Sequence, residues 1–189
     1  LTIHAAVVAK QGQAMVIPAP PGSGKSTLCA LLCSHGWQLL SDEFALIDLA
    51  SHQVQSLPRP ISLKNASIDV LKAYAEQGVC QGVFSAEFTG TSKGRVALYS
   101  VPLTQQAEPL ARYPIKRVLF PRYDAHQACH ITPLSPAQCL MQLADNSFNF
   151  SVLGQQGFTC LASVVGSSDA YSVDYSDFDA LLTKLETLP

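Results

Sequence analysis

Positive charge is scarce in this chain of 189 residues. Only 12 lysines and arginines stand against 14 aspartates and glutamates, and the formal net charge is -2. The basic residues form no block of the kind that binds nucleic acid or an anionic membrane surface. The composition therefore predicts no nucleic-acid partner.

Long apolar runs and paired cysteines are also missing. No apolar stretch approaches the roughly 20 residues of a membrane-spanning helix, and the first residues have the pattern of a strand rather than of a signal peptide. The six cysteines form no C-x-x-C pair and no zinc-ligand spacing with histidine. We interpret them as small core residues of a reduced protein, and we expect a cytoplasmic protein without a membrane span.

Apolar residues make up 48% of the chain. Their spacing is typical of helices in some segments and of strands in others. Two apolar runs at 2–9 and 14–18 are joined by a turn too short for a parallel crossover, so they should pair antiparallel. A loop at 19–24 precedes a helix predicted over 25–35. Strands should follow, one ending at Asp42 and one over 44–49.

The rest of the chain continues this mixture of strands and helices. The Pro-broken stretch "SLPRPISLKN" is predicted to be irregular, and the Gly-, Ser- and Thr-rich piece 78–94 to be a mobile loop. The Ser135-Pro136 pair is typical of a helix start. Further strands are predicted at 94–102, 115–121, 128–134 and 170–175, and further helices at 66–77, 136–145, 148–165 and 177–187. We expect one α/β domain over residues 1–189.

The stretch "APPGSGKSTL" at 19–28 resembles a phosphate-binding loop (P-loop). It follows the pattern G-x-x-x-x-G-K-[ST] with Ala19 in place of the first glycine, between a strand and a helix. Glycines let consecutive N–H groups curl around an anion, and the helix N-terminus adds partial positive charge. Lys25 should reach the β and γ phosphates, and Ser26 should bind Mg²⁺. The predicted nucleotide-binding residues are Pro21, Gly22, Ser23, Gly24, Lys25, Ser26 and Thr27.

Two adjacent carboxylates, Asp42 and Glu43, follow an apolar run about sixteen residues after this loop. An acidic residue at a strand end beside a P-loop can hold Mg²⁺ or its waters, and a second can accept a proton from an attacking hydroxyl. We predict Asp42 as the base and Glu43 as the metal-facing residue. The alternative is a solvated turn.

Other candidates have weaker signals. His4 lies on an apolar strand, where a core histidine is the ordinary alternative to a functional one. Several basic residues near loops or strand ends could stabilise the charge of phosphoryl transfer or lie free on the surface. These are Arg59, Lys64, Lys93, Arg95 and Arg122.

Together these residues resemble the catalytic core of HPr kinase/phosphorylase, a group that shares a P-loop fold with phosphoenolpyruvate carboxykinase. The segments "PPGSGKSTL", "LLSDEF" and "PRPISLKN" are similar to the HPr kinase-related proteins called kinase A. The resemblance implies an α/β fold of the HPr kinase/PEP carboxykinase type, with an antiparallel strand pair before the P-loop. It implies that His4 is the active-site histidine preceding the loop, and that Asp42 is the base for a serine hydroxyl. HPr kinases are hexamers, so a homo-oligomer is one assembly that the resemblance suggests.

The chain departs from true HPr kinases in one respect that affects the substrate. It has no counterpart of their Glu-Ile-Arg-Gly-Leu-Gly signature, so HPr itself is not the expected acceptor. We predict a kinase dependent on ATP and Mg²⁺ that phosphorylates a hydroxyl on a small molecule or a protein serine. The alternatives are a nucleotide-binding sensor without phosphotransfer and an NTPase that moves a partner.

Overall fold

The computed structural model describes residues 1–20 and 22–188. Its first two strands, β1 (Thr2–Lys10) and β2 (Gln13–Pro18), pair antiparallel through the short turn between them, as the sequence predicts. The loop that follows leads into α1 (Lys25–Ser34), which ends one residue before the predicted boundary.

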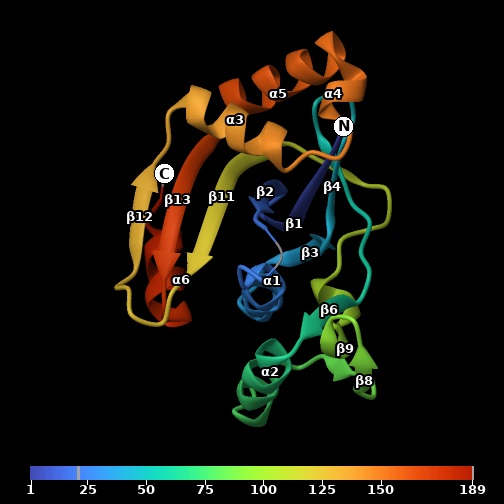
Figure 1. The fold of residues 1–189 in the computed structure, drawn as a ribbon, viewed down its shortest axis with the longest axis vertical. Helices are drawn as coiled ribbons and strands as arrows, with labels where there is room; N and C mark the ends of the chain where they lie inside the picture. Colours follow the sequence, from blue (N-terminus) through green and yellow to red (C-terminus); the bar gives the residue numbers. More distant parts are fainter. Residues whose placement is uncertain (21, 189) are drawn as a thin grey trace.

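A large sheet of nine strands, counted over the described residues, forms the centre of the molecule (Figure 1). The strand order is β10-β5-β4-β1-β2-β11-β13-β12, and β3 pairs with β1 outside this path. β11 runs parallel to both β2 and β13, whereas the other pairs are antiparallel. The remaining strands of this sheet have the bounds β3 (Gln38–Ser41), β4 (Phe44–Ile47), β5 (Val54–Gln55), β10 (Arg112–Tyr113), β11 (Ile115–Tyr123), β12 (His130–Pro133) and β13 (Asp169–Tyr175).

Helices cover both faces of this sheet. One face packs against α3 (Pro136–Asp145), α4 (Phe150–Leu153) and α5 (Gln155–Ser167), at the top of Figure 1. The other packs against α1 and α6 (Phe178–Glu186). Ser135 caps α3 in the predicted position with a full capping box. The helix predicted over 148–165 is instead two helices, because Gly154 lies at φ 55° between them.

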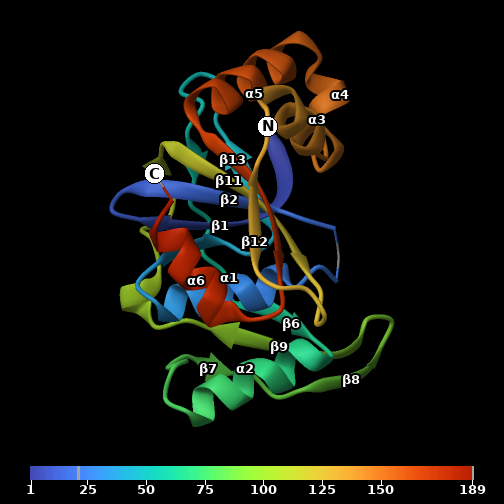
Figure 2. The same cartoon turned by 90° about the vertical axis from the view of Figure 1, so that its left-hand side faces the viewer.

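A second, smaller sheet lies beyond α1, and here two predictions are wrong (Figures 1 and 2). The stretch predicted to be irregular contains β6 (Ile61–Lys64), and the predicted loop 78–94 contains β7 (Val83–Phe84) and β8 (Phe88–Thr91). All three pair antiparallel with β9 (Gly94–Ser100). The prolines precede β6 rather than interrupt it, so its backbone donors remain available for pairing.

The chain segment that forms α2 (Ala66–Glu76) and the small sheet leaves the large sheet after β5 and rejoins it at β10. β5 and β10 are antiparallel neighbours, so the segment leaves and returns at one place. Beyond them, Ser56 donates its N–H to the Ala111 carbonyl at 2.8 Å and accepts from the Leu110 N–H at 3.0 Å. The segment between is therefore an excursion that starts and ends at the same point. Between β9 and β10, the excursion also contains a 3₁₀ turn at Leu103–Gln105.

In the part of the chain that the structure describes, no helix combines the length and the apolar character needed to cross a bilayer.

Candidate functional site

The loop after β2 contains two glycines in a left-handed backbone conformation. Gly22 and Gly24 both have φ of +85°, a region that side chains strain to adopt. Gly24 is the N-cap of α1, and no side chain of the described residues caps the helix there. Gly24 and the first residues of the helix, 25–27, line the cavity described below. The Ser23 hydroxyl is buried and has no hydrogen-bond partner among the described residues. Pro21, predicted to belong to this loop, lies outside the described residues.

Lys25, the first residue of α1, contacts His4 across the loop. The Lys25 Nζ lies 2.9 Å from His4 Nε2 and 3.5 Å from the Ala19 carbonyl oxygen. Because an ammonium group can only donate, the imidazole accepts at Nε2 and carries its proton on Nδ1. Burial, and then the charge of Lys25, lowers the pKa of His4, and burial lowers the pKa of Lys25. Both shifts favour the uncharged forms of the two side chains.

Asp42 lies between the end of β3 and the start of β4 and is almost completely buried, with 4% of its surface exposed. Its Oδ2 accepts hydrogen bonds from the Ser26 hydroxyl at 3.2 Å and from the Ser62 N–H at 3.0 Å. Its Oδ1 is buried with no partner among the described residues. Burial raises the pKa of Asp42, and the bonds from Ser62 and Ser26 oppose that rise.

These residues line one cavity of about 700 Å³. Glu43 lies on the same wall but is exposed, whereas its neighbour Asp42 is buried. Most of the predicted site residues share this cavity: His4, Gly22, Gly24, Lys25, Ser26, Thr27, Asp42, Glu43, Lys64 and Lys93. The structure thus brings together residues that lie up to 89 positions apart in the chain.

Three predicted basic residues lie elsewhere. Arg122 forms an ion pair with Asp174 at 2.6 Å near the exposed C-terminal end of β11. Arg95 forms ion pairs with Asp69 and Glu87. Arg59 is exposed on the stretch before β6 and does not line the cavity.

Sequence reasoning missed several residues of this cavity. Ser62 binds Asp42 through its backbone, and no side-chain pattern reveals such a role. An aromatic group from α2, β11, β13 and α6 lines the end of the cavity beside α1: Tyr74, Tyr123, Tyr175 and Phe178. Tyr123 and Tyr175 are register partners with their rings 5.6 Å apart, which could be found only by knowing the parallel pairing of their strands.

Comparison with known proteins gives little beyond this geometry. No family model matches the chain, and no curated protein sequence matches it. Among solved structures, the Hpr(Ser) kinase/phosphatase from Coxiella burnetii is similar over 98% of this chain and 92% of that one, with a TM-score of 0.42 and 13% sequence identity. This is a distant similarity of overall fold.

Proposed function

We propose that the protein is a phosphotransferase that moves the γ-phosphoryl group of ATP to a hydroxyl of an acceptor. The observation that supports this most directly is Asp42. A buried carboxylate with one oxygen that has no partner in the described part of the chain is costly to the fold. It lies beside the lysine and the serine of a glycine-rich loop. Such a group suits an acceptor of protons or a ligand of a cation, and both belong to phosphoryl transfer.

In this proposal each residue has a separate task. The loop N–H groups and Lys25 bind the phosphates, with Lys25 exchanging its contact to His4 for one to phosphate oxygen. The acceptor oxygen forms a bond to the γ-phosphorus, and the bond from that phosphorus to the bridging oxygen breaks, which leaves a nucleoside diphosphate. Asp42 takes the proton of the acceptor hydroxyl. Its raised pKa makes it a better base than an exposed aspartate.

The residues present also fit a magnesium ion. Mg²⁺ prefers oxygen ligands and commonly takes only one or two from the protein, with phosphates and waters completing its shell. The Ser26 hydroxyl and the carboxylates of Asp42 and Glu43 line the cavity beside the loop. When bound there, the ion would neutralise charge on the phosphates. No larger cluster of metal-binding side chains is found among the described residues.

The test compares Asp42→Asn with the unaltered protein. Incubation with γ-labelled ATP, Mg²⁺ and an extract of small molecules and proteins should label an acceptor. Loss of a general base typically reduces the rate by ~10²–10⁴-fold, and the loose transition state of phosphoryl transfer favours the lower part of that range. The affinity for Mg·ATP, measured by calorimetry, should persist because the loop and Lys25 remain.

Asp48→Asn is the matched control, since Asp48 follows the next strand but does not line the cavity. It should transfer phosphate at the unaltered rate. An Asp42→Asn protein that also transfers at that rate would remove Asp42 as the base. Nucleotide binding with no labelled acceptor would favour the sensor, and ATP consumption that needs no acceptor would favour the NTPase.

A further inference from the structure

The side chains of two lysines that line the cavity have no hydrogen-bond or ion-pair partner among the described residues. Most other basic side chains form an ion pair or a hydrogen bond, namely Lys10, Lys25, Lys72, Arg95, Arg112, Lys116, Arg117, Arg122 and Lys184. Lys64, at the end of β6, and Lys93, in the turn between β8 and β9, form neither, yet both line the cavity. Lys64 is half-buried there. Lys93 is exposed. Two unpaired positive charges on the lining of one cavity favour a negatively charged ligand.

The backbone that carries Lys93 is held in place by Asn65. The Asn65 side chain donates to the Lys93 carbonyl at 3.2 Å and accepts from the Arg95 backbone N–H at 3.1 Å. The Asn65 backbone N–H donates to the Arg95 carbonyl at 3.0 Å. Asn65 has φ of 51° and ψ of -124°, a conformation that is strained for any residue with a side chain. This strained residue follows Lys64 in the chain and is hydrogen-bonded to the backbone of Lys93.

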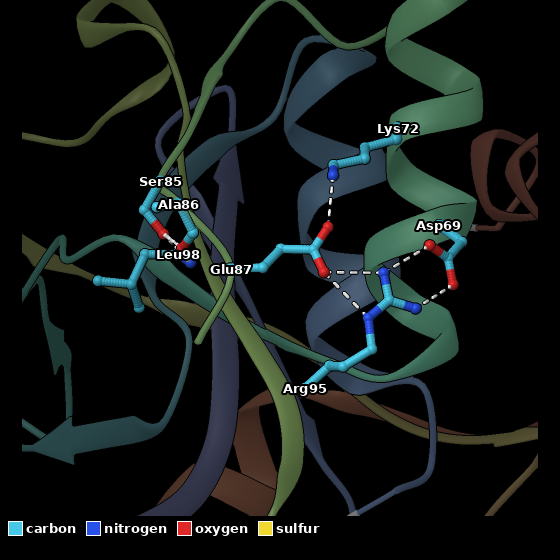
Figure 3. Close-up of polar contacts among 7 residues, drawn as sticks. All are labelled: Asp69, Lys72, Ser85, Ala86, Glu87, Arg95 and Leu98. Atoms are coloured by element: carbon cyan, nitrogen blue, oxygen red, sulfur yellow. Dashed lines mark hydrogen bonds and ion pairs between the residues drawn. The ribbon is translucent and has the colours of Figure 1, made fainter. Parts of the chain in front are cut away.

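A network of charges fixes the same hairpin to α2 (Figure 3). Arg95 on β9 places its guanidinium against both oxygens of Asp69 at 2.9 Å and also contacts Glu87 at 2.9 Å. Lys72 on α2 contacts the other oxygen of Glu87 at 2.6 Å. Exposed ion pairs contribute little one by one, but a bidentate arginine within a network fixes geometry. The network thus holds the β8–β9 hairpin, and Lys93 with it, against the first turns of α2.

We infer that Lys64 and Lys93 form a second anion subsite on the wall of the cavity that the small sheet provides. The N-terminal residues Ala66 and Ser67 of α2 line the same wall. The inference rests on the proposed function and specifies its substrate. The acceptor is a small hydroxyl compound that also carries a phosphate or carboxylate group. The loop and Lys25 hold the nucleotide, and the two lysines hold the anionic group of the acceptor.

The experiment fills the loop first and then probes the second subsite. Protein saturated with Mg²⁺ and a non-hydrolysable ATP analogue is titrated with inorganic phosphate, and separately with acetate, in a calorimeter. One phosphate or one acetate should bind per chain, and the better probe identifies the anionic group. Lys64→Met and Lys93→Met should each weaken this binding ~10-fold, as expected for loss of one hydrogen bond to a charged group. The affinity for the analogue should stay close to its original value in both variants.

Lys116→Met is the control, because Lys116 lies outside the cavity and should leave both affinities unchanged. Two results would overturn the inference: no binding of either anion at saturating analogue, or equal weakening of anion and analogue binding in the lysine variants. Neither result bears on Asp42→Asn in the transfer assay. If the analogue itself fails to bind, the proposed function fails, and titration of Lys25→Met protein with phosphate still tests the second subsite.

Discussion

At the scale of single residues, the cavity holds buried ionisable side chains whose burial does not favour folding. Asp42 is buried, and one of its oxygens has no partner within residues 1–20 and 22–188. Lys25 is buried against a histidine rather than against a carboxylate. The motif predicts that these residues act together, since a glycine-rich loop before a helix and an acidic strand end leave clear marks in a sequence. The motif does not predict the ion pair between Arg122 and Asp174, because that contact depends on the register of β11 against β13.

The buried charge of Asp42 predicts that Asp42→Asn stabilises the protein at neutral pH. Its pKa is raised by burial, so the folded protein loses stability as pH rises from the unfolded pKa of about 4 to the raised folded value. Asparagine has no such step, and its amide oxygen can still accept from Ser62. We expect a gain of about 1 kcal/mol in the free energy of unfolding at pH 7, vanishing near pH 3.

Urea titrations across this pH range measure the gain. Asp48→Asn should behave in the opposite way, because hydrogen bonds from Ser51 lower the pKa of Asp48 and its charged form stabilises the fold above that pKa. An Asp42→Asn protein that is less stable than the original at every pH would show that its neighbours compensate the burial of this carboxylate.

At the scale of elements, most strands of the large sheet were predictable, although β5 and β10 were not, whereas only β9 of the small sheet was predicted. Strands β1 and β2 show long apolar runs around a short turn, and α3 begins at a clear capping box. β6 does alternate, with Ile61 and Leu63 buried, but the prolines before it obscure the pattern. β8 is exposed along its whole length and forms because β9 lies beside it, which is long-range information.

The hairpin of β8 and β9 predicts a difference between two glycine substitutions. Gly94 and Gly90 have similar φ angles, +80° and +74°, so alanine should cost each about 1 kcal/mol in backbone strain. A Cβ on Gly94 would also lie 2.3 Å from the Asn65 side-chain oxygen, whereas one on Gly90 would meet nothing within 4 Å. Gly94→Ala should therefore cost a further ~1–3 kcal/mol in urea unfolding. Equal costs would mean that Asn65 moves aside freely.

At the scale of the whole molecule, two groups of buried side chains lie on opposite faces of the large sheet. One contains α3 and α5. The other is continuous from the sheet through α1 and α6 to α2 and the small sheet. Because α1 contributes to this second core on both its sides, the small sheet shares its buried surface with the large one. We expect the two sheets to unfold together.

Alanine at one position in each core tests this expectation. Leu63 on β6 and Leu143 on α3 are both fully buried, and truncation of such a leucine typically costs ~2–5 kcal/mol. Calorimetry should show one transition for each variant, shifted to lower temperature, with equal calorimetric and van't Hoff enthalpies. A separate early transition in Leu63→Ala alone would show that the small sheet melts independently.

The meeting of entry and exit at Ser56 and Ala111 has a consequence for how such a chain can change over generations. An excursion whose two ends lie together can be lengthened, shortened or exchanged while the strands that flank it keep their pairing. The glycine-rich loop and Asp42 lie outside this excursion, whereas Ser62, Lys64 and Lys93 lie within it. Duplicated genes could therefore diverge in one wall of the cavity and inherit the other unaltered.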